Sequence, residues 1–235
     1  MPLTPDSWTY KYFLKYVMNF FSEVNWDFLY RKKKLADPLL TAEEIVALKK
    51  VLDQDYYIIC SVHYTHLSYW LISIAQKIKR GTWAKWGHVF MNYDYDKTDK
   101  PMFCEATGRI GVRVIGFEEL MAGDGFVLLK PKNLDLDKFT SVIDAGLKKN
   151  IGKPYDDLFD MQNQTRLSCV ELVLVVLEQI PGYKDFFKKF FTMQKTIKTI
   201  TPDSYPDCGD FEELCSVRRK ILWVPAKKNL SMLTK

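Results

Sequence analysis

A strongly apolar segment, Ser168-Cys-Val-Glu-Leu-Val-Leu-Val-Val-Leu177, follows a polar stretch at residues 162–167. Apolar side chains lie nearly all round the helix predicted over residues 169–180, so this helix is expected to be buried. Cys169 stands at its start, where peptide N–H groups favour a thiolate and can contribute to an oxyanion hole. The segment therefore predicts a buried helix with a candidate nucleophilic thiol at its N-terminus.

Upstream of this helix the apolar pattern is that of a sheet. Short runs rich in β-branched and aromatic residues are separated by polar or glycine-containing turns, which is typical of antiparallel strands. Strands are predicted at residues 56–62, 88–93, 102–106, 112–117, 126–130 and 221–224, with helices at 67–79 and 135–149 and an acidic loop at 207–215. The order predicts an α+β fold in which an antiparallel sheet packs on helices.

Two helices are predicted before the first strand. Apolar residues recur at helical spacing over residues 8–34, which end in the basic run 31–34. Thr41 and Glu44 form a capping-box pattern that begins a second helix ending near residue 52. We therefore predict a helical N-terminal extension at residues 1–53, a main domain at 54–225 and a tail at 226–235.

The composition and charge argue against a nucleic-acid-binding or transmembrane protein. The 235 residues contain 47% hydrophobic residues and carry a formal charge of +5, which is too mild to predict nucleic-acid binding. No apolar run is long enough for a transmembrane helix, and the sequence has no secretory signal pattern. Five cysteines at irregular spacing favour a reducing compartment, so a cytoplasmic location is expected.

Three residues could together form a thiol active site. A cysteine nucleophile needs a histidine within hydrogen-bonding reach and a third polar group that orients the imidazole. His88 begins one predicted strand, and Glu105 lies on the next, so antiparallel pairing can place them side by side near Cys169. Taken singly, each also fits a structural role: a buried thiol, a partly buried histidine and a surface carboxylate.

Two other groups of residues that contain cysteine are candidate sites. Cys60, His63 and His66 have the ligand types of a zinc site but no evident fourth ligand, so neither a metal nor another cofactor is predicted. Cys208 and Cys215 lie in the acidic loop, where a disulfide, a metal pair or two free thiols are the alternatives, the last being favoured in a reducing compartment.

The order of several short motifs resembles a known family, the circularly permuted NlpC-type papain-like hydrolases and especially the YiiX-like proteins. Within residues 55–225 these motifs are Asp55-Tyr-Tyr-Ile-Ile59, Trp86-Gly-His-Val-Phe90, Glu105-Ala106 followed by Gly111-Val112 and Phe117, Gly152-Lys-Pro-Tyr-Asp156 and Ser168-Cys-Val-Glu-Leu-Val173. The histidine precedes the cysteine, which is the order that permutation of a papain-like chain produces.

The resemblance implies a permuted papain-like fold and assigns roles to four residues. Cys169 would be the nucleophile, His88 the base and Glu105 the group that orients His88, while Tyr155 would correspond to the tyrosine that these enzymes place near the nucleophile. Val170 departs from the family pattern, because relatives have a small polar residue after the cysteine.

The resulting functional hypothesis is a cysteine hydrolase of the peptidase or amidase class. It would cleave a peptide or cell-wall-peptide-like amide through an acyl-enzyme on Cys169. One alternative is a thiol-dependent lipid acyltransferase or lipase, with the aromatic helix at residues 8–34 lying on a membrane surface. The other alternative is an inert papain-like binding module in which Cys169 is buried.

Overall fold

The computed structural model describes residues 38–64, 67–93, 101–108, 110–156, 164–190, 192, 200–219 and 227–230. The helix predicted at residues 8–34, the basic run 31–34, His66 and the strand predicted at 221–224 lie outside these residues.

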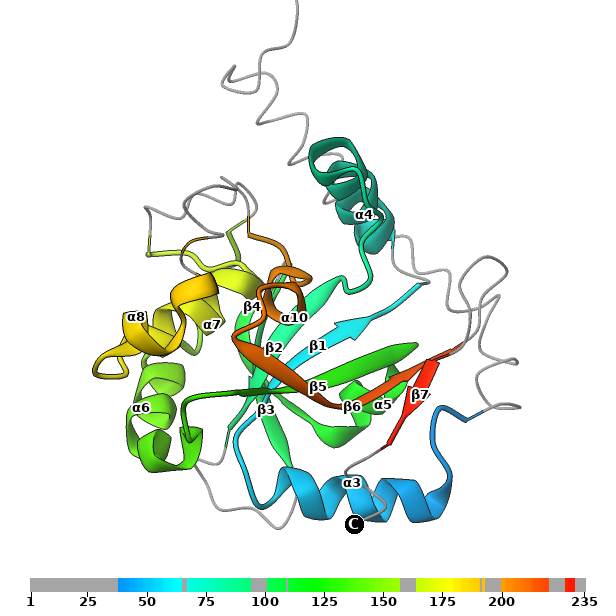
Figure 1. Cartoon of the computed structure of the whole chain (residues 1–235), viewed down its shortest axis with the longest axis horizontal. Coiled ribbons are helices and arrows are strands. Elements are labelled where there is room, and N and C mark those ends of the chain that lie inside the picture. Colours follow the sequence, from blue (N-terminus) through cyan, green and yellow to red (C-terminus); the bar gives the residue numbers. More distant parts are fainter. Residues whose placement is uncertain are drawn as a thin grey trace, which may run out of the picture.

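The described strands form one antiparallel sheet (Figure 1). The strands lie in the order β4-β3-β2-β1-β5-β6-β7, and every neighbouring pair is antiparallel. Their bounds are β1 (Ile58–Val62), β2 (His88–Asn92), β3 (Met102–Thr107), β4 (Gly111–Gly116), β5 (Gly125–Pro131), β6 (Phe211–Arg218) and β7 (Lys227–Asn229). This sheet, together with the helices around it, is the mixed α+β fold that the sequence predicts.

Helices precede, interrupt and follow the strands. They are α3 (Ala42–Leu52), α4 (Leu67–Arg80), α5 (Phe117–Ala122), η1 (Leu136–Phe139), α6 (Thr140–Asn150), α7 (Cys169–Leu177), α8 (Tyr183–Phe186) and α10 (Ser204–Asp207). The predicted capping box at Thr41 and Glu44 is present and begins α3. Among the described residues, no helix has the length and apolar character needed to cross a membrane.

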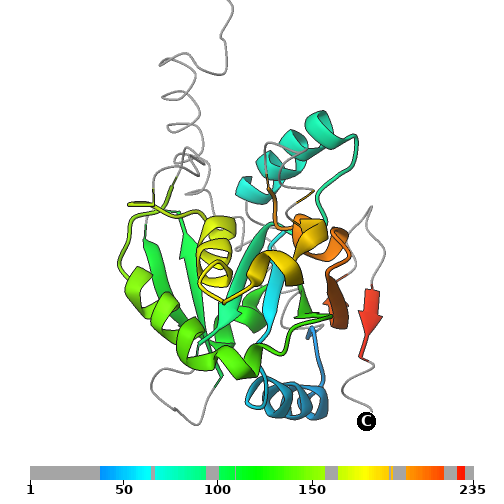
Figure 2. The same ribbon diagram turned by 60° about the vertical axis from the view of Figure 1, so that its left-hand side comes forward.

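One hydrophobic cluster lies between the sheet and α7. Val89 and Met91 of β2 and Cys104 of β3 pack with Leu172 and Val173 of α7. α7 lies beside α6, which Figure 2 shows from one side. The helix that the sequence predicts as buried is therefore at the centre of the larger core.

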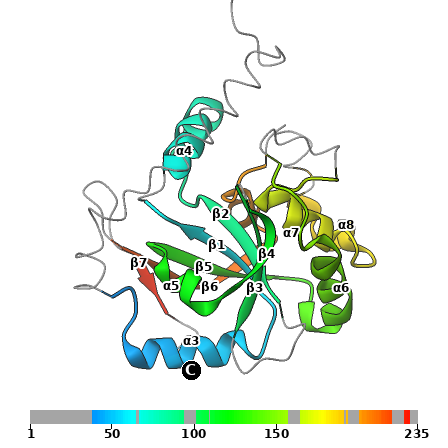
Figure 3. The same cartoon turned by 180° about the vertical axis from the view of Figure 1, so that it is seen from behind.

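A second cluster contains the alternate residues of the same strands. Phe90 and Phe103 pack with Leu48 and Leu52 of α3, which is seen from behind in Figure 3. Because successive side chains of a strand point to opposite faces, the two clusters lie on opposite faces of the sheet. α3, which the sequence places in the N-terminal extension, is thus part of the packed core.

The prediction of an acidic loop at residues 207–215 is wrong over most of that range, because β6 begins at Phe211. Glu212 and Glu213 are exposed on this strand, and the register with β5 shifts at Leu128 and Leu129. A bulge breaks the period-two pattern of a strand, so the sequence lacked the usual signal. Cys208 and Cys215 are both buried free thiols, which excludes the disulfide considered above.

We expect Leu48→Ala to destabilise the protein by about 2–5 kcal/mol, because this side chain of α3 is fully buried against the sheet. The matched change Val46→Ala, on the same helix at a position that is 69% exposed, should alter stability by less than about 0.5 kcal/mol. Urea unfolding followed by circular dichroism measures both variants. Equal effects of the two changes would contradict the packing of α3 on the sheet.

Candidate active site

The start of α7 is fixed by a capping box that the sequence analysis did not identify. Ser168 Oγ accepts a hydrogen bond from the Glu171 N–H at 3.4 Å, and the Ser168 N–H donates to Glu171 Oε2 at 2.7 Å. Such reciprocal bonds satisfy two N–H groups at the N-terminus of a helix. They make Cys169 the first residue of the helix, and its side chain is only 4% exposed.

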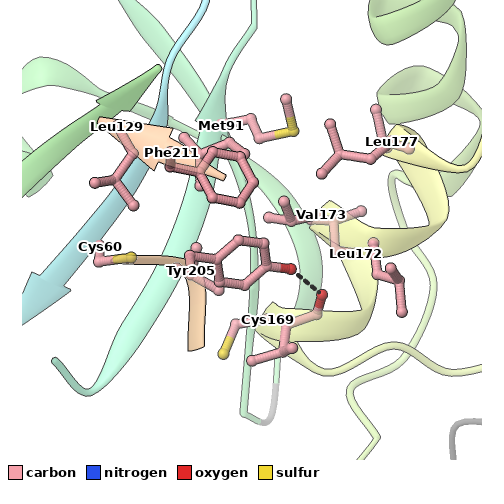
Figure 4. Close-up of a cluster of buried hydrophobic side chains, with 14 of the residues drawn as sticks. Cys60, Met91, Leu129, Cys169, Leu172, Val173, Leu177, Tyr205 and Phe211 are labelled. Carbon is pink, nitrogen blue, oxygen red and sulfur yellow. Dashed lines mark hydrogen bonds between the residues drawn. The ribbon is translucent and has the colours of Figure 1, made fainter. Parts of the chain in front are cut away.

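Tyr205 holds the first turn of α7 from the other side. Its hydroxyl donates to the Val170 carbonyl at 2.9 Å, as Figure 4 shows beside Cys169. Tyr205 is itself fully buried in the cluster that contains Cys169. The thiol therefore lies on a backbone that is fixed by the capping box and by this buried phenol.

The segment before Cys169 is attached to the beginning of β4. Val112 N–H donates to the Lys153 carbonyl and Gly152 N–H to the Val112 carbonyl, both at 2.9 Å, and Leu167 N–H donates to the Pro154 carbonyl at 3.1 Å. Gly111 permits this approach: its φ is 87°, and a Cβ there would lie 2.1 Å from the Lys153 carbonyl oxygen. The end of the sheet where β3 gives way to β4 thus positions the chain that leads to the thiol.

His88 and Glu105 are hydrogen-bonded to each other. The distance from His88 Nε2 to Glu105 Oε2 is 2.7 Å. Arg113, directly opposite Glu105 in the β3–β4 ladder, contacts the other oxygen, Oε1, through Nε and Nη2, each at 2.8 Å. The Glu105 side chain is only 8% exposed, so a nearly buried carboxylate lies between two cationic side chains.

The faces of the sheet show how the imidazole reaches the thiol. His88 lies near Phe90, with ring centroids 5.6 Å apart, and Phe90 belongs to the cluster on the side of α3. α7 packs on the other face, yet Cys169 is one of the groups that raise the pKa of the His88 imidazole, so the two side chains interact. Each of these two residues is the first of its element, so we infer that they meet at the end of the sheet, where no further strand residue separates the faces.

The surroundings shift the pKa of both members of the His88–Glu105 pair. Burial lowers the pKa of His88, but the hydrogen bonds with Cys169 and Glu105 outweigh this effect and raise it to about 10. Burial raises the pKa of Glu105, but the hydrogen bond and charge of His88, together with Arg113, lower it to about 2. At neutral pH the site therefore contains an imidazolium and a carboxylate.

Asp203 positions the segment that leads into β2. Its carboxylate accepts hydrogen bonds from the Lys85 N–H at 2.9 Å, the Trp86 N–H at 2.8 Å and Gln76 Nε2 at 2.7 Å. Burial raises the pKa of Asp203, while these hydrogen bonds act in the opposite direction. The two residues before Gly87 and His88 are thereby fixed from α4 and from the start of α10.

The four residues singled out in the sequence are not equally placed. Cys169, His88 and Glu105 are brought together, whereas Tyr155 is half-buried and packs against the edge of the cluster that contains Cys169. Its role near the nucleophile stays a prediction.

The possible zinc ligands Cys60, His63 and His66 are not brought together as a described site. His66 lies outside the described residues, and within them no group of three or more His, Cys, Asp or Glu side chains could hold a metal. Cys60 Sγ instead donates to the Pro202 carbonyl at 3.5 Å.

Sequence reasoning missed Arg113, Asp203 and Tyr205. Arg113 could have been found, because a hairpin centred on residue 109 places an arginine opposite the candidate Glu105. Asp203 and Tyr205 offer no such local signal, since they reach the site from a segment more than 100 residues after His88.

Comparison with known proteins found one solved structure. No family model matches the chain, and no curated protein matches it. The crystal structure of the metalloprotein YiiX from Escherichia coli O157:H7 is similar at a TM-score of 0.49 and 19% sequence identity, over 71% of this chain and 97% of that one. This neighbour bears the name of the YiiX-like group that the motifs resemble, while the permuted papain-like assignment stays a prediction.

We expect Glu105→Gln to lower the melting temperature at pH 6, because it removes a buried carboxylate that pairs with two cations, worth about 3 kcal/mol. The folded-state pKa of Glu105 lies below its ordinary value of 4.5, so its stabilisation is present above that pH and is lost as the pH falls towards 2. Thermal scans between pH 2.5 and 6 should show the difference from wild type shrinking in acid. The exposed change Glu212→Gln is the control, and a difference for Glu105→Gln that does not vary with pH would refute the pairing.

Proposed function

We propose that the protein is a thiol hydrolase that cleaves an amide bond through an acyl-enzyme on Cys169. The observation that carries the proposal is the placement of the His88 imidazole, which interacts with the Cys169 thiol and is hydrogen-bonded to the Glu105 carboxylate. This combination of nucleophile, base and orienting group is what cysteine catalysis requires.

The proposal gives each ring nitrogen of His88 a different role. Nε2 is held by Glu105, so Nδ1 is the nitrogen left to exchange a proton with the thiol. With that proton on the imidazole, the Cys169 sulfur attacks the amide carbonyl carbon and a C–S bond forms, while the carbonyl oxygen takes up the electron pair. Glu105 stabilises the imidazolium and maintains its orientation during this step.

The remaining steps return the enzyme to its starting state. The imidazolium gives its proton to the departing amine as the C–N bond breaks, which leaves a thioester on Cys169. A water molecule then loses a proton to His88 and attacks the thioester, so that the C–S bond breaks and a carboxylic acid is released. Peptide or cell-wall-peptide-like amides are the substrate class that the motif resemblance suggests.

The start of α7 can stabilise the oxyanion. The capping box uses the N–H groups of Ser168 and Glu171, whereas those of Cys169 and Val170 belong to the first turn and have no acceptor within the helix. Backbone N–H groups next to the nucleophile stabilise negative charge on the carbonyl oxygen of a tetrahedral intermediate. We therefore assign this role to the first turn, and place Tyr155 at the border of the same site.

A specific observation favours the inert binding module as the second candidate. Cys169 is 4% exposed, and a nucleophile must be reachable by its substrate. The His88 side chain is more open, at 21%, so access to the thiol would be from the side of the imidazole. Thiol reactivity separates the two candidates.

We expect iodoacetamide at pH 6 to alkylate Cys169 before any other cysteine, because the His88 imidazole can take up its proton, whereas burial disfavours ionisation of the other four thiols. Burial raises the pKa of Cys104 to about 12, of Cys208 to about 11 and of Cys215 to about 12, and raises the pKa of Cys60 as well. Peptide mass mapping over a time course measures the order of modification.

His88→Gln should slow the alkylation of Cys169 by a factor of about ten or more, whereas His63→Gln, at a histidine outside this pair, serves as the matched control. An unmodified Cys169 in folded protein, with Cys208 or Cys215 reacting first, would favour the inert module.

We expect the wild-type protein to release amine from some members of a panel of fluorogenic peptide amides, and Cys169→Ala to reduce that rate by a factor of about 1,000 or more. Cys208→Ala removes another buried thiol and should retain the activity. Mass spectrometry of the stalled reaction should show the acyl group on Cys169. Activity that survives in Cys169→Ala would refute the mechanism.

A further inference from the structure

Arg218, the last residue of β6, lies at the same end of the sheet as His88. It pairs with Gly125 of β5, which in turn pairs with Val62 at the end of β1. A Cβ on Gly125 would lie 3.0 Å from Arg218 Cγ, so the glycine leaves room for the arginine stem. Val62 belongs to the cluster that includes Cys169, and the register therefore places Arg218 on the α7 face.

The guanidinium of Arg218 lies over an aromatic wall next to His88. Its central carbon is 5.9 Å from the centroid of the Trp86 ring. Trp86 is separated from His88 only by Gly87, against which Tyr69 packs so closely that a Cβ would lie 2.9 Å from its ring. Tyr64 meets Tyr69 edge to face, with centroids 5.3 Å apart. The Trp86–Tyr69–Tyr64 wall is thus continuous with the start of β2.

Two hydrogen-bond donors at this wall have no partner among the residues that the structure describes. They are Arg218 Nε and the Tyr64 hydroxyl, and both are buried. Within the same part of the chain, Arg218 forms no ion pair with an acidic residue. Burial raises the pKa of the Tyr64 phenol, and the positive charge of Arg218 acts in the opposite direction. A nearby acid, Asp124, is already engaged by the Tyr64 N–H at 2.8 Å and by Arg219 Nε at 3.8 Å.

An unpaired donor in a buried site costs free energy, which a bound acceptor recovers. An arginine over an aromatic ring keeps its N–H groups directed outward in the plane of the guanidinium, where they suit carboxylate and phosphate oxygens. Arg218 and Tyr64 together offer a charged donor and a neutral donor on one side of the candidate active site.

We propose that Arg218 and Tyr64 bind an anionic group of the substrate, a carboxylate or a phosphate, close to the amide bond that Cys169 attacks. The proposal deepens the hydrolase proposal and rests on it: the preferred substrates are amides with a negative charge near the cleaved bond.

Two alkylating agents of similar size test this site without knowledge of the natural substrate. Iodoacetate is anionic and iodoacetamide is neutral, and both transfer a two-carbon group to the Cys169 sulfur with loss of iodide. We expect Arg218→Gln to slow the reaction of iodoacetate with Cys169 about fivefold at low salt and to leave the iodoacetamide rate within about a factor of two. Arg218→Lys, which keeps the charge, should retain most of the iodoacetate rate.

Further variants separate local binding from general charge. Tyr64→Phe removes only the hydroxyl and should give a smaller loss, of about twofold, for iodoacetate alone. Lys149→Gln removes an exposed charge on α6 and should change neither rate. Acetate and inorganic phosphate, added as competitors, should protect the wild-type protein against iodoacetate but should not protect Arg218→Gln. The competitor that protects more strongly identifies whether a carboxylate or a phosphate is the preferred group. Melting curves verify that each variant is folded.

The outcomes distinguish the two proposals. If neither reagent modifies Cys169 in the wild type, the hydrolase proposal fails. If iodoacetamide reacts normally but the iodoacetate rate is the same in wild type, Arg218→Gln and Lys149→Gln, the anion site is refuted while the reactive thiol stands. An equal loss of rate with both reagents in folded Arg218→Gln would also refute the anion site, since that result shows a distorted site rather than a lost anion contact.

Discussion

The carboxylate of Glu105 is buried between the His88 imidazole and the Arg113 guanidinium, and the arrangement of the site depends on this pairing. Burying a carboxylate costs free energy unless charged hydrogen-bond donors compensate it. The burial of Glu105 therefore constrains the positions of the His88 and Arg113 side chains. His88 is held at the first residue of β2 by the hydrogen bond between its Nε2 and Glu105. Arg113 is fixed across the β3–β4 ladder, which makes the hairpin part of the site.

The thiol is positioned by a separate set of contacts. The capping box of Ser168 and Glu171 begins α7 at Cys169, Tyr205 holds the next carbonyl, and Gly111 allows the preceding segment to lie against β4. The capping box and Tyr205 belong to the helical layer, whereas Gly111 belongs to the same β3–β4 hairpin as Glu105 and Arg113. This hairpin therefore contributes to the placement of both the imidazole and the thiol.

Much of this organisation could be predicted from the sequence because it is local. The apolar run after Cys169 predicts a buried helix, and the short apolar runs around His88 and Glu105, separated by a polar turn, predict paired strands. The sequence could not predict that His88 and Cys169 interact although their elements belong to opposite faces of the sheet. That interaction depends on the residues at which β2 and α7 begin. The hydrogen bonds of Asp203 to the segment before His88 join residues 117 and 118 positions apart, and no local pattern records them. β6 was missed because its bulge and exposed glutamates hide the strand pattern.

The chain order of the site has a consequence for biosynthesis. β1 to β4 are adjacent in the sheet and consecutive in the chain, so the carboxylate, the imidazole and the guanidinium can assemble on a ribosome before Cys169 has been synthesised. Cys169 is synthesised later, on a helix that docks onto a sheet already carrying His88. The interaction between His88 and Cys169 therefore forms only when α7 packs on the sheet, so assembly of the candidate site coincides with formation of the larger core.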